Sequence, residues 1–183
     1  STPAFVAARN GHKECLQLLK EAGCDLGQAN NDGNTPAFMA ARNGHKECLQ
    51  LIKEAGCDLG QANKDGSTPA FVAARNGHKE CLQLIKEAGC DLGQANKDGS
   101  TPAFVAARSG HKECLQLLKE ARCDLGQADK NGYTPAMVAA RNGHKECLQL
   151  IKEAGCDLGQ ANKDGSTPAF VAARNGHKEC LQL

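Results

Sequence analysis

The chain has 183 residues, with 22 lysines and arginines against 21 aspartates and glutamates, so its formal net charge at pH 7 is +1. There is no basic surplus to attract nucleic acid or an anionic membrane surface. The apolar fraction of 40% and the charged fraction of 23% are typical of a folded globular protein. No run approaches the roughly 18 apolar residues of a transmembrane helix, and no signal peptide is visible. We therefore expect no nucleic-acid binding and no membrane insertion.

The dominant feature of the sequence is a repeat of 33 residues. Thr-Pro recurs at this step from Thr2 to Thr167, and the eleven cysteines follow the same period. The chain holds five periods and 18 further residues, and residues 166–183 repeat residues 1–18 letter for letter. A fixed period of this length is typical of arrays in which each repeat packs only on its neighbours.

The first element of each repeat is a short helix that starts at the Thr-Pro pair. Thr2 is a plausible N-cap, and Pro3 fits the first helical position, where no backbone donor is needed. The alanines that follow are small enough to let neighbouring elements approach closely. Asn10 and Gly11 tolerate left-handed geometry and end the helix. The pattern predicts a helix from Pro3 to Asn10 and in each equivalent segment.

The second element is an amphipathic helix predicted from Lys13 to Ala22. Cys15, Leu16 and Leu19 recur at helical spacing, with charged residues largely on the other side. Gly23 supplies the C-terminal stop. Residues 26–34 contain Asn-Asp-Gly, and equivalent segments contain Lys-Asp-Gly. These segments are predicted to reverse the chain as a hairpin-like loop. Two short helices form a single layer, so each repeat must bury its apolar stripe against the next repeat.

These residues resemble the ankyrin repeat family. The matching features are Thr-Pro, the alanine pair, the Asn-Gly-His of residues 10–12, the leucine pair and the Ala-Gly-x-Asp of residues 22–25, over the whole chain. The resemblance implies an all-α fold in which helix-turn-helix-loop repeats stack into a curved solenoid, as a single array over residues 1–183. It also implies a non-enzymatic scaffold for protein–protein interaction, with a concave groove formed by loop tips and first helices.

The chain departs from the family pattern at three places. Ala4 and Phe5 stand where leucine and histidine are usual, and we interpret the phenylalanine as filling the space left by the alanine. Gly27 replaces a common asparagine. Arg122 stands where the other repeats have the glycine that ends the second helix. Left-handed geometry at an arginine should cost roughly 1 kcal/mol, which would make this repeat the least stable.

The cysteines and histidines are the residues with the most chemical potential in each repeat. The spacing His12-x-x-Cys15 suits a soft metal or a nucleophile, but no further ligands, distinct base or oxyanion donor accompany it. We favour a structural role, with the histidine bracing the turn as the family implies, and expect no catalysis, metal or cofactor. Equivalent cysteines should lie ~8–10 Å apart, beyond the ~7 Å limit for a disulfide. Two alternatives remain. One is a Cys15–Cys24 disulfide, and the other, which we favour, is reduced thiols in an intracellular, cytoplasmic protein.

Binding is the function that remains. The repeats are nearly identical, which indicates either recent duplication or a repetitive partner. The loop tips vary most, and Met39 and Tyr133 are unusual residues that could act as local anchors. The row of arginines at the ends of the first helices could attract an extended, acidic protein. The predicted groove residues are Arg42, Arg75, Arg108, Arg141, Asn31, Lys64, Lys97, Lys130, Lys163, Asp65, Asp98, Met39 and Tyr133.

The ends suggest an alternative of another class. Ser1 begins directly at a first helix, Leu183 is predicted to lie inside a second helix, and neither end carries a polar cap. The sequence therefore looks like part of a longer array. Uncapped apolar ends could also associate head to tail and make the chain a structural spacer or filament element. The identity of any partner is not legible in the sequence.

Overall fold

The computed structural model describes residues 1–183 as eleven short α-helices joined by turns and loops, with no β-strand. The chain divides into two compact units, Ser1–Leu92 and Gly93–Leu183. The first contains α1 (Pro3–Asn10), α2 (Lys13–Glu21), α3 (Pro36–Asn43), α4 (Lys46–Glu54), α5 (Pro69–Asn76) and α6 (Lys79–Glu87). The second contains α7 (Pro102–Ser109), α8 (Lys112–Glu120), α9 (Pro135–Arg141), α10 (Lys145–Glu153) and α11 (Pro168–Arg174). The predicted all-α fold of helix-turn-helix-loop repeats is confirmed.

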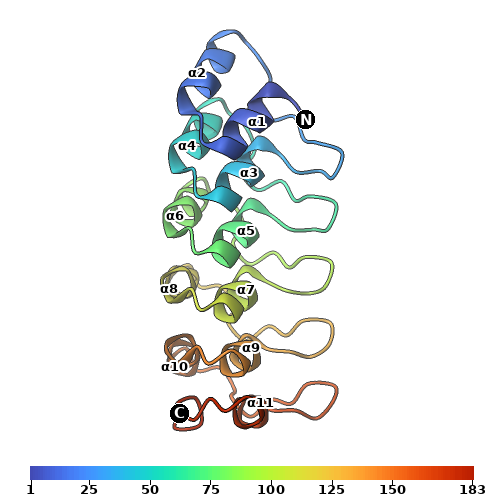
Figure 1. Ribbon diagram of the computed structural model, residues 1–183, viewed down its shortest axis with the longest axis vertical. Helices are drawn as coiled ribbons and strands as arrows, with labels where there is room; N and C mark the ends of the chain where they lie inside the picture. The colour runs from blue at the N-terminus through green and yellow to red at the C-terminus, as the bar shows by residue number, and fades with distance from the viewer. The chain divides into compact units, whose positions relative to one another are not determined.

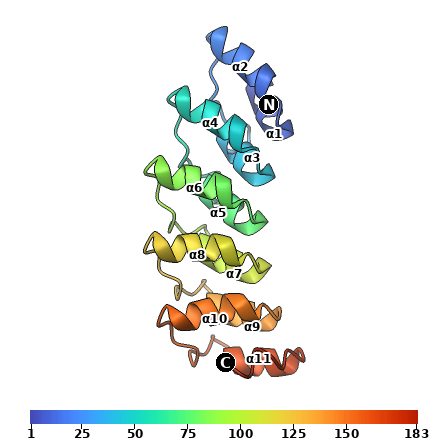
Figure 2. The same ribbon diagram turned by 90° about the vertical axis from the view of Figure 1, so that its left-hand side faces the viewer.

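Within each unit the helices stack in two rows. In the first unit α1 packs on α3 and α3 on α5, while α2, α4 and α6 form the second row. In the second unit α7, α9 and α11 form one row, and α8 packs on α10. Within each unit, the connecting loops project from the odd-numbered row, on the side away from the even-numbered helices (Figure 1), and Figure 2 shows the even-numbered helices in front of the odd-numbered ones. That residues 1–183 form one array stays a prediction.

The odd-numbered helices begin as the Thr-Pro pair predicts. In α5 the hydroxyl oxygen of Thr68 accepts a hydrogen bond from the amide of Phe71 at 3.1 Å, and Thr68 is itself buried. The alanines inside these helices are fully buried, as at Ala74 and Ala107, so neighbouring helices pack closely. Phe38 is 4% exposed beside the small Ala37, in agreement with the interpretation that phenylalanine fills this space.

The even-numbered helices bury one face and expose the other. In α4, Cys48, Leu49 and Ile52 are at most 1% exposed. These helices end one residue earlier than predicted, at Glu21 in α2, because Ala22 is the cap residue. The prediction of a second helix at the end of the chain is wrong. Residues 177–181 form only turns with bonds between residues three apart, since so short a segment cannot continue the helical ladder.

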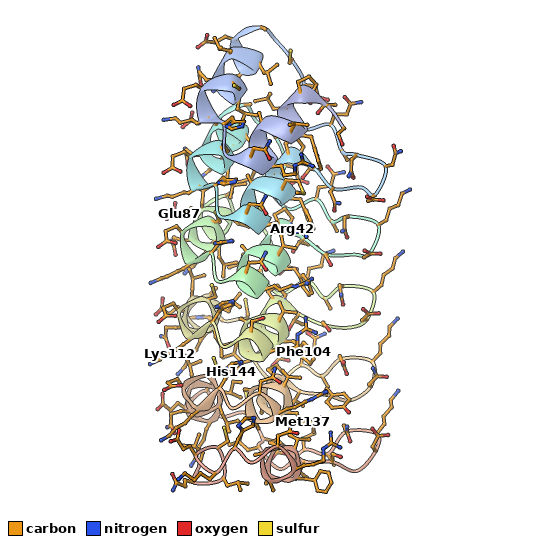
Figure 3. All side chains as sticks on the ribbon, viewed as in Figure 1. Arg42, Glu87, Phe104, Lys112, Met137 and His144 are labelled. Atoms are coloured by element: carbon orange, nitrogen blue, oxygen red, sulfur yellow. The ribbon has the colours of Figure 1, made fainter.

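Side chains at the turn between paired helices connect successive repeats. The carbonyl oxygen of Arg9 accepts from the side-chain amide of Asn43 at 2.7 Å and lies 3.1 Å from Nε2 of His45. Asn142 and His144 hold the carbonyl of Arg108 in the same way. These two histidines therefore connect each turn to the preceding repeat, which agrees with the structural role that the sequence favours. Figure 3 labels His144 beside the helices of its repeat.

Arg122 adopts the conformation of the glycines that it replaces. Its φ is +62°, and it is the one residue other than glycine with positive φ. Its backbone amide donates to the carbonyl of Lys119 at 2.9 Å, and Cys123 donates to Leu118 at 3.0 Å. The left-handed ending of α8 is thus kept, which is the condition under which the sequence predicts a cost at Arg122.

Candidate functional site

Each loop tip is a compact turn fixed by an asparagine or aspartate side chain. In the first unit Oδ1 of Asn63 accepts from the backbone amides of Asp65 at 3.0 Å and Ser67 at 2.9 Å. The backbone amide of Asn63 in turn donates to the carbonyl of Ser67 at 2.9 Å. Such a side-chain bond to nearby amides holds the turn without help from other elements. The tips are therefore preorganised surfaces.

Neighbouring tips are joined through their backbones. The amide of Lys64 donates to the carbonyl of Asp32 at 2.9 Å, and Lys130 donates to Asp98 at 2.9 Å. Gly99 allows this close approach, because a Cβ at this position would lie 3.0 Å from the Lys130 amide nitrogen. The lysine side chains extend into solvent from tips that are fixed relative to their neighbours in the same unit.

Most of the predicted groove residues are accessible. The four arginines lie near the ends of odd-numbered helices, and the asparagine, lysines and aspartates lie on the tips. Arg108 also lies over the ring of Phe104, with 6.0 Å between the guanidinium carbon and the ring centroid. The exposed predicted residues are Arg42, Arg75, Arg108, Arg141, Asn31, Lys64, Lys97, Lys130, Lys163, Asp65 and Asp98.

The prediction that Met39 anchors a partner is wrong. Its side chain is only 6% exposed, because this position of α3 packs inside the first unit. The equivalent Val72 and Val138 are buried as well. Met39 differs from the residue at this position in the other repeats, and the difference changes a side chain that is buried.

Five predicted residues come together in the second unit. They line a pocket of about 490 Å³ between two successive tips and the helices α7 and α9. We call it the Tyr133 pocket. Phe104 and Val138 line it and are nearly buried, so they form its apolar floor, while Tyr133 is half-buried. The five predicted residues are Asp98, Arg108, Lys130, Tyr133 and Arg141.

Sequence reasoning missed the floor of this pocket and one of its acids. Phe104 and Val138 belong to the common repeat and carry no signal of their own. Asp129 and Asn131 are visible in the sequence as differences between the tips, but they are not among the predicted groove residues. Figure 3 shows Phe104 and Met137 on the loop side of their helices and Lys112 on the opposite side. The residue differences at 129, 131 and 133 thus gather at one place.

The tip that follows Tyr133 lacks a side-chain hydrogen bond that one tip of the first unit makes. In the first unit Nδ2 of Asn63 donates to Oδ1 of Asn34, 29 residues earlier, at 3.0 Å. The residue 29 positions before Asn162 is Tyr133. Asn162 is 6% exposed, and its Nδ2 has no hydrogen-bond partner. A tyrosine ring offers no acceptor near the backbone, which explains this orphaned donor.

The buried cysteines Cys48 and Cys147 are poorly suited to nucleophilic chemistry. All eleven cysteines are thiols without disulfide bonds. Burial, followed by the charges of Glu146 and Glu113, raises the pKa of Cys147 to about 11. Burial also raises the pKa of Cys48. The thiolate is the reactive form, so a raised pKa disfavours catalysis or metal binding by these residues at neutral pH. No group of three or more His, Cys, Asp or Glu side chains is placed to hold a metal ion.

The even-numbered helices carry a second hollowed surface, in the first unit. A furrow of about 590 Å³ lies between α2 and α4 and is lined by Lys13, Gln17, Lys46, Glu47 and Glu54, among others. Lys20 forms an ion pair with Glu54 at 3.8 Å at the surface. Charges of both signs alternate here, which is typical of a solvated helix face.

Comparison with known families agrees with the resemblance seen in the sequence. A search of curated proteins finds no match for the chain. No helix has the length and apolar character that crossing a membrane requires. The family described as "Ankyrin repeats (3 copies)" matches residues 1–63, 50–129, 70–162 and 116–183, which together span the whole chain. The chain therefore belongs to the ankyrin repeat family.

Proposed function

We propose that this chain is a non-enzymatic scaffold that binds a protein partner along its loop tips and first helices. Ankyrin repeats are generally protein–protein interaction modules, and proteins built from them are typically binding scaffolds without catalytic activity. The observation that carries the proposal is the Tyr133 pocket, where five residues predicted from sequence line one hollow.

The composition of the pocket fits a protein interface. An apolar floor surrounded by charged side chains, with an aromatic residue and two arginines, has the residue types that dominate binding energy in protein complexes. The tips are already fixed by side-chain and backbone hydrogen bonds. A partner therefore binds with little loss of loop entropy, which favours affinity.

The proposal extends to an acidic, extended partner at the arginine row, in an intracellular compartment where thiols stay reduced. Each arginine is exposed at a helix end. The backbone carbonyls of Arg42, Arg108 and Arg141 each accept a hydrogen bond from an asparagine of the following repeat. The arginine positions are therefore defined relative to the next repeat, as recognition of successive acidic residues requires.

The test is a selection of binders from a displayed library of extended peptides, followed by affinity measurement on the 183-residue chain. The triple variant Arg75→Gln, Arg108→Gln and Arg141→Gln should weaken the selected binders at least tenfold. The matched control replaces Lys46, Lys79 and Lys112 on the even-numbered helices by glutamine, with the same change in charge, and should leave affinity within about twofold. Equal losses for the two triples, or no enriched binder, would refute the proposal.

A second candidate function is head-to-tail self-association, as a spacer or filament element. In this chain Leu18 is 65% exposed, whereas the equivalent Leu51 is 7% exposed. Phe170 is 52% exposed, whereas the equivalent Phe104 is 3% exposed. The exposed face at residues 1–19 also contains an apolar hollow of about 730 Å³. An accessible apolar face of this kind favours association with a matching face.

Light scattering over a wide range of concentrations tests this second candidate. Growth in mass with concentration that is abolished by Leu18→Glu or by Phe170→Glu supports head-to-tail association. A constant monomer mass in the unchanged chain excludes it. The glutamate variants also serve the binding assays, because the Tyr133 pocket contains neither residue.

A further inference from the structure

The Tyr133 pocket is a single distinctive place in an otherwise uniform repeat. Tyr133 replaces the serine found at residues 67, 100 and 166, and Asp129 replaces the asparagine found at residues 63, 96 and 162. Asn131 replaces the aspartate found at residues 65, 98 and 164. All three changed residues line the same pocket. A repetitive groove gains specificity where successive positions differ, so this pocket is where the chain can distinguish one segment of a partner from another.

The changes alter which charges face a partner. Oδ1 of Asp129 accepts from the backbone amides of Asn131 and Tyr133, both at 2.9 Å, so this carboxylate is held within its own turn. The neutral Asn131 follows Lys130, whereas an aspartate follows the lysine of the other lysine-bearing tips. The pocket thus combines three cationic side chains with Asp98 and an internally bonded Asp129. Its electrostatic complement is an anionic group.

The buried amide of Asn162, in the tip that follows the pocket, is a second observation. Asn162 is more than nine-tenths buried and its Nδ2 has no partner, whereas Asn63 makes the equivalent bond in the first unit. Tyr133 stands where Asn34 supplies the acceptor for Asn63, and its ring supplies none to Asn162. Positions where a buried polar group lacks the partner that an equivalent position has are typically functional sites. The loss at Asn162 is explained if the exposed part of the tyrosine ring serves binding.

We propose that the Tyr133 pocket binds an aspartate or glutamate side chain of an extended segment of the partner protein. Arg108, Arg141 and Lys130 receive the carboxylate, and the apolar side chain beside it packs on the Tyr133 ring and the floor of the pocket. Arginine suits this role because its planar guanidinium donates two parallel hydrogen bonds to a carboxylate. This inference rests on the proposed scaffold function and assigns its specificity to one pocket.

The chain offers a built-in probe for the test. It has one tyrosine and no tryptophan, so its tyrosine fluorescence reports on this pocket alone. The ligands are two blocked nine-residue peptides of glycine and serine that differ only at the centre, Leu-Asp-Leu in one and Leu-Asn-Leu in the other. Calorimetry measures affinity and fluorescence measures location. The aspartate peptide should change the Tyr133 emission saturably, and the asparagine peptide should bind at least fivefold more weakly.

Variants separate the pocket from the rest of the groove. Arg141→Gln should weaken the aspartate peptide at least fivefold, while Arg75→Gln, the same position of the repeat in the first unit, should change it less than twofold. Tyr133→Ser restores the common residue of the repeat, so its loss of binding cannot be ascribed to misfolding. The double variant Tyr133→Ser, Ser67→Tyr keeps one tyrosine but moves it to the first unit, and it should not recover affinity.

Four results would overturn the inference. The first is a Tyr133 fluorescence emission that does not change when the aspartate peptide is added, and the second is equal affinity for the two peptides. The third is an equal effect of Arg75→Gln and Arg141→Gln on affinity, and the fourth is no binding of the aspartate peptide at millimolar concentration. None of these refutes the scaffold function, which fails if the library selection yields no binder sensitive to the arginine triple. The two proposals are therefore tested by separate outcomes.

Discussion

Arg122→Gly should stabilise the second unit, because it removes a side chain from a left-handed backbone. Arg122 has a φ of +62°, and Gly23, Gly56, Gly89 and Gly155 occupy the same position with φ between +73° and +80°. A side chain at such φ costs about 1–2 kcal/mol. Glycine also gives the unfolded chain more freedom, which offsets about 0.4–1 kcal/mol of this gain. The expected net gain is about 0.5–1 kcal/mol.

The reverse substitution gives a matched control. Gly56→Arg places a side chain where an added Cβ would meet no atom within 4 Å, so its cost comes from backbone strain and not from a clash, less the same unfolded-chain term. It should destabilise the first unit by about the amount that Arg122→Gly gains. For a chain of this size, about 1 kcal/mol corresponds to a shift in Tm of about 2–4 °C.

Thermal and urea unfolding followed by circular dichroism measures both changes, and hydrogen exchange at the amide of Cys123 measures the local effect. That amide donates to Leu118 across the end of α8 and should become more protected in Arg122→Gly. Suppose that Arg122→Gly changes neither the unfolding stability nor the protection of the Cys123 amide, and that Gly56→Arg does not change the stability either. The left-handed position then carries no strain, and the reasoning fails.

Three further outcomes are expected. Thr68→Ala should destabilise the first unit by about 1 kcal/mol in urea unfolding, because it removes the acceptor for the Phe71 amide, and equal stability would contradict the capping role. Tyr133→Ser should raise stability by up to about 1 kcal/mol, because a hydroxyl beside Asn162 can accept from its amide, and a drop in Tm would refute this account. Burial raises the pKa of Cys147 above its unfolded value of 9.0 to about 11, so this thiol favours folding at neutral pH and its contribution is lost between pH 9 and 11. In Cys147→Val the unfolding midpoint should fall less steeply between pH 9 and 11. An unchanged dependence of the midpoint on pH would contradict this account.

The fold could be predicted because its determinants are local and repeated. Thr-Pro starts a helix, Asn-Gly ends it, and the spacing of apolar residues defines the partner helix, so the predicted bounds Pro3–Asn10 agree with the structure. Six copies in phase make each local preference consistent with the stacked arrangement. The segment after residue 177 is the exception, because its helical pattern continues for too few residues to form a helix.

The pocket could be predicted only in part, because exposure depends on packing between repeats. Met39 and Tyr133 are both unusual residues in their repeats, but Met39 lies on a buried face of α3 and Tyr133 at the edge of a tip. Nothing in the sequence near Asn162 indicates that its amide lacks an acceptor, since the missing partner lies 29 residues earlier. Sequence differences located the variable site, and contacts between repeats determine which of them reach solvent.

The arrangement of uniform and distinctive positions suggests how such a chain can combine stability with specificity. Within each unit, nearly identical repeats bury the same alanines, leucines and cysteines, so their packing does not depend on any one loop tip. A tip can therefore lose a hydrogen bond at Asn162 and expose part of an aromatic ring at Tyr133 without unfolding its unit. A single globular core would tolerate such a change less readily, because its contacts are shared by the whole domain. The proposed binding site therefore depends on differences at residues 129, 131 and 133, which line one pocket, and not on the buried residues that the repeats share.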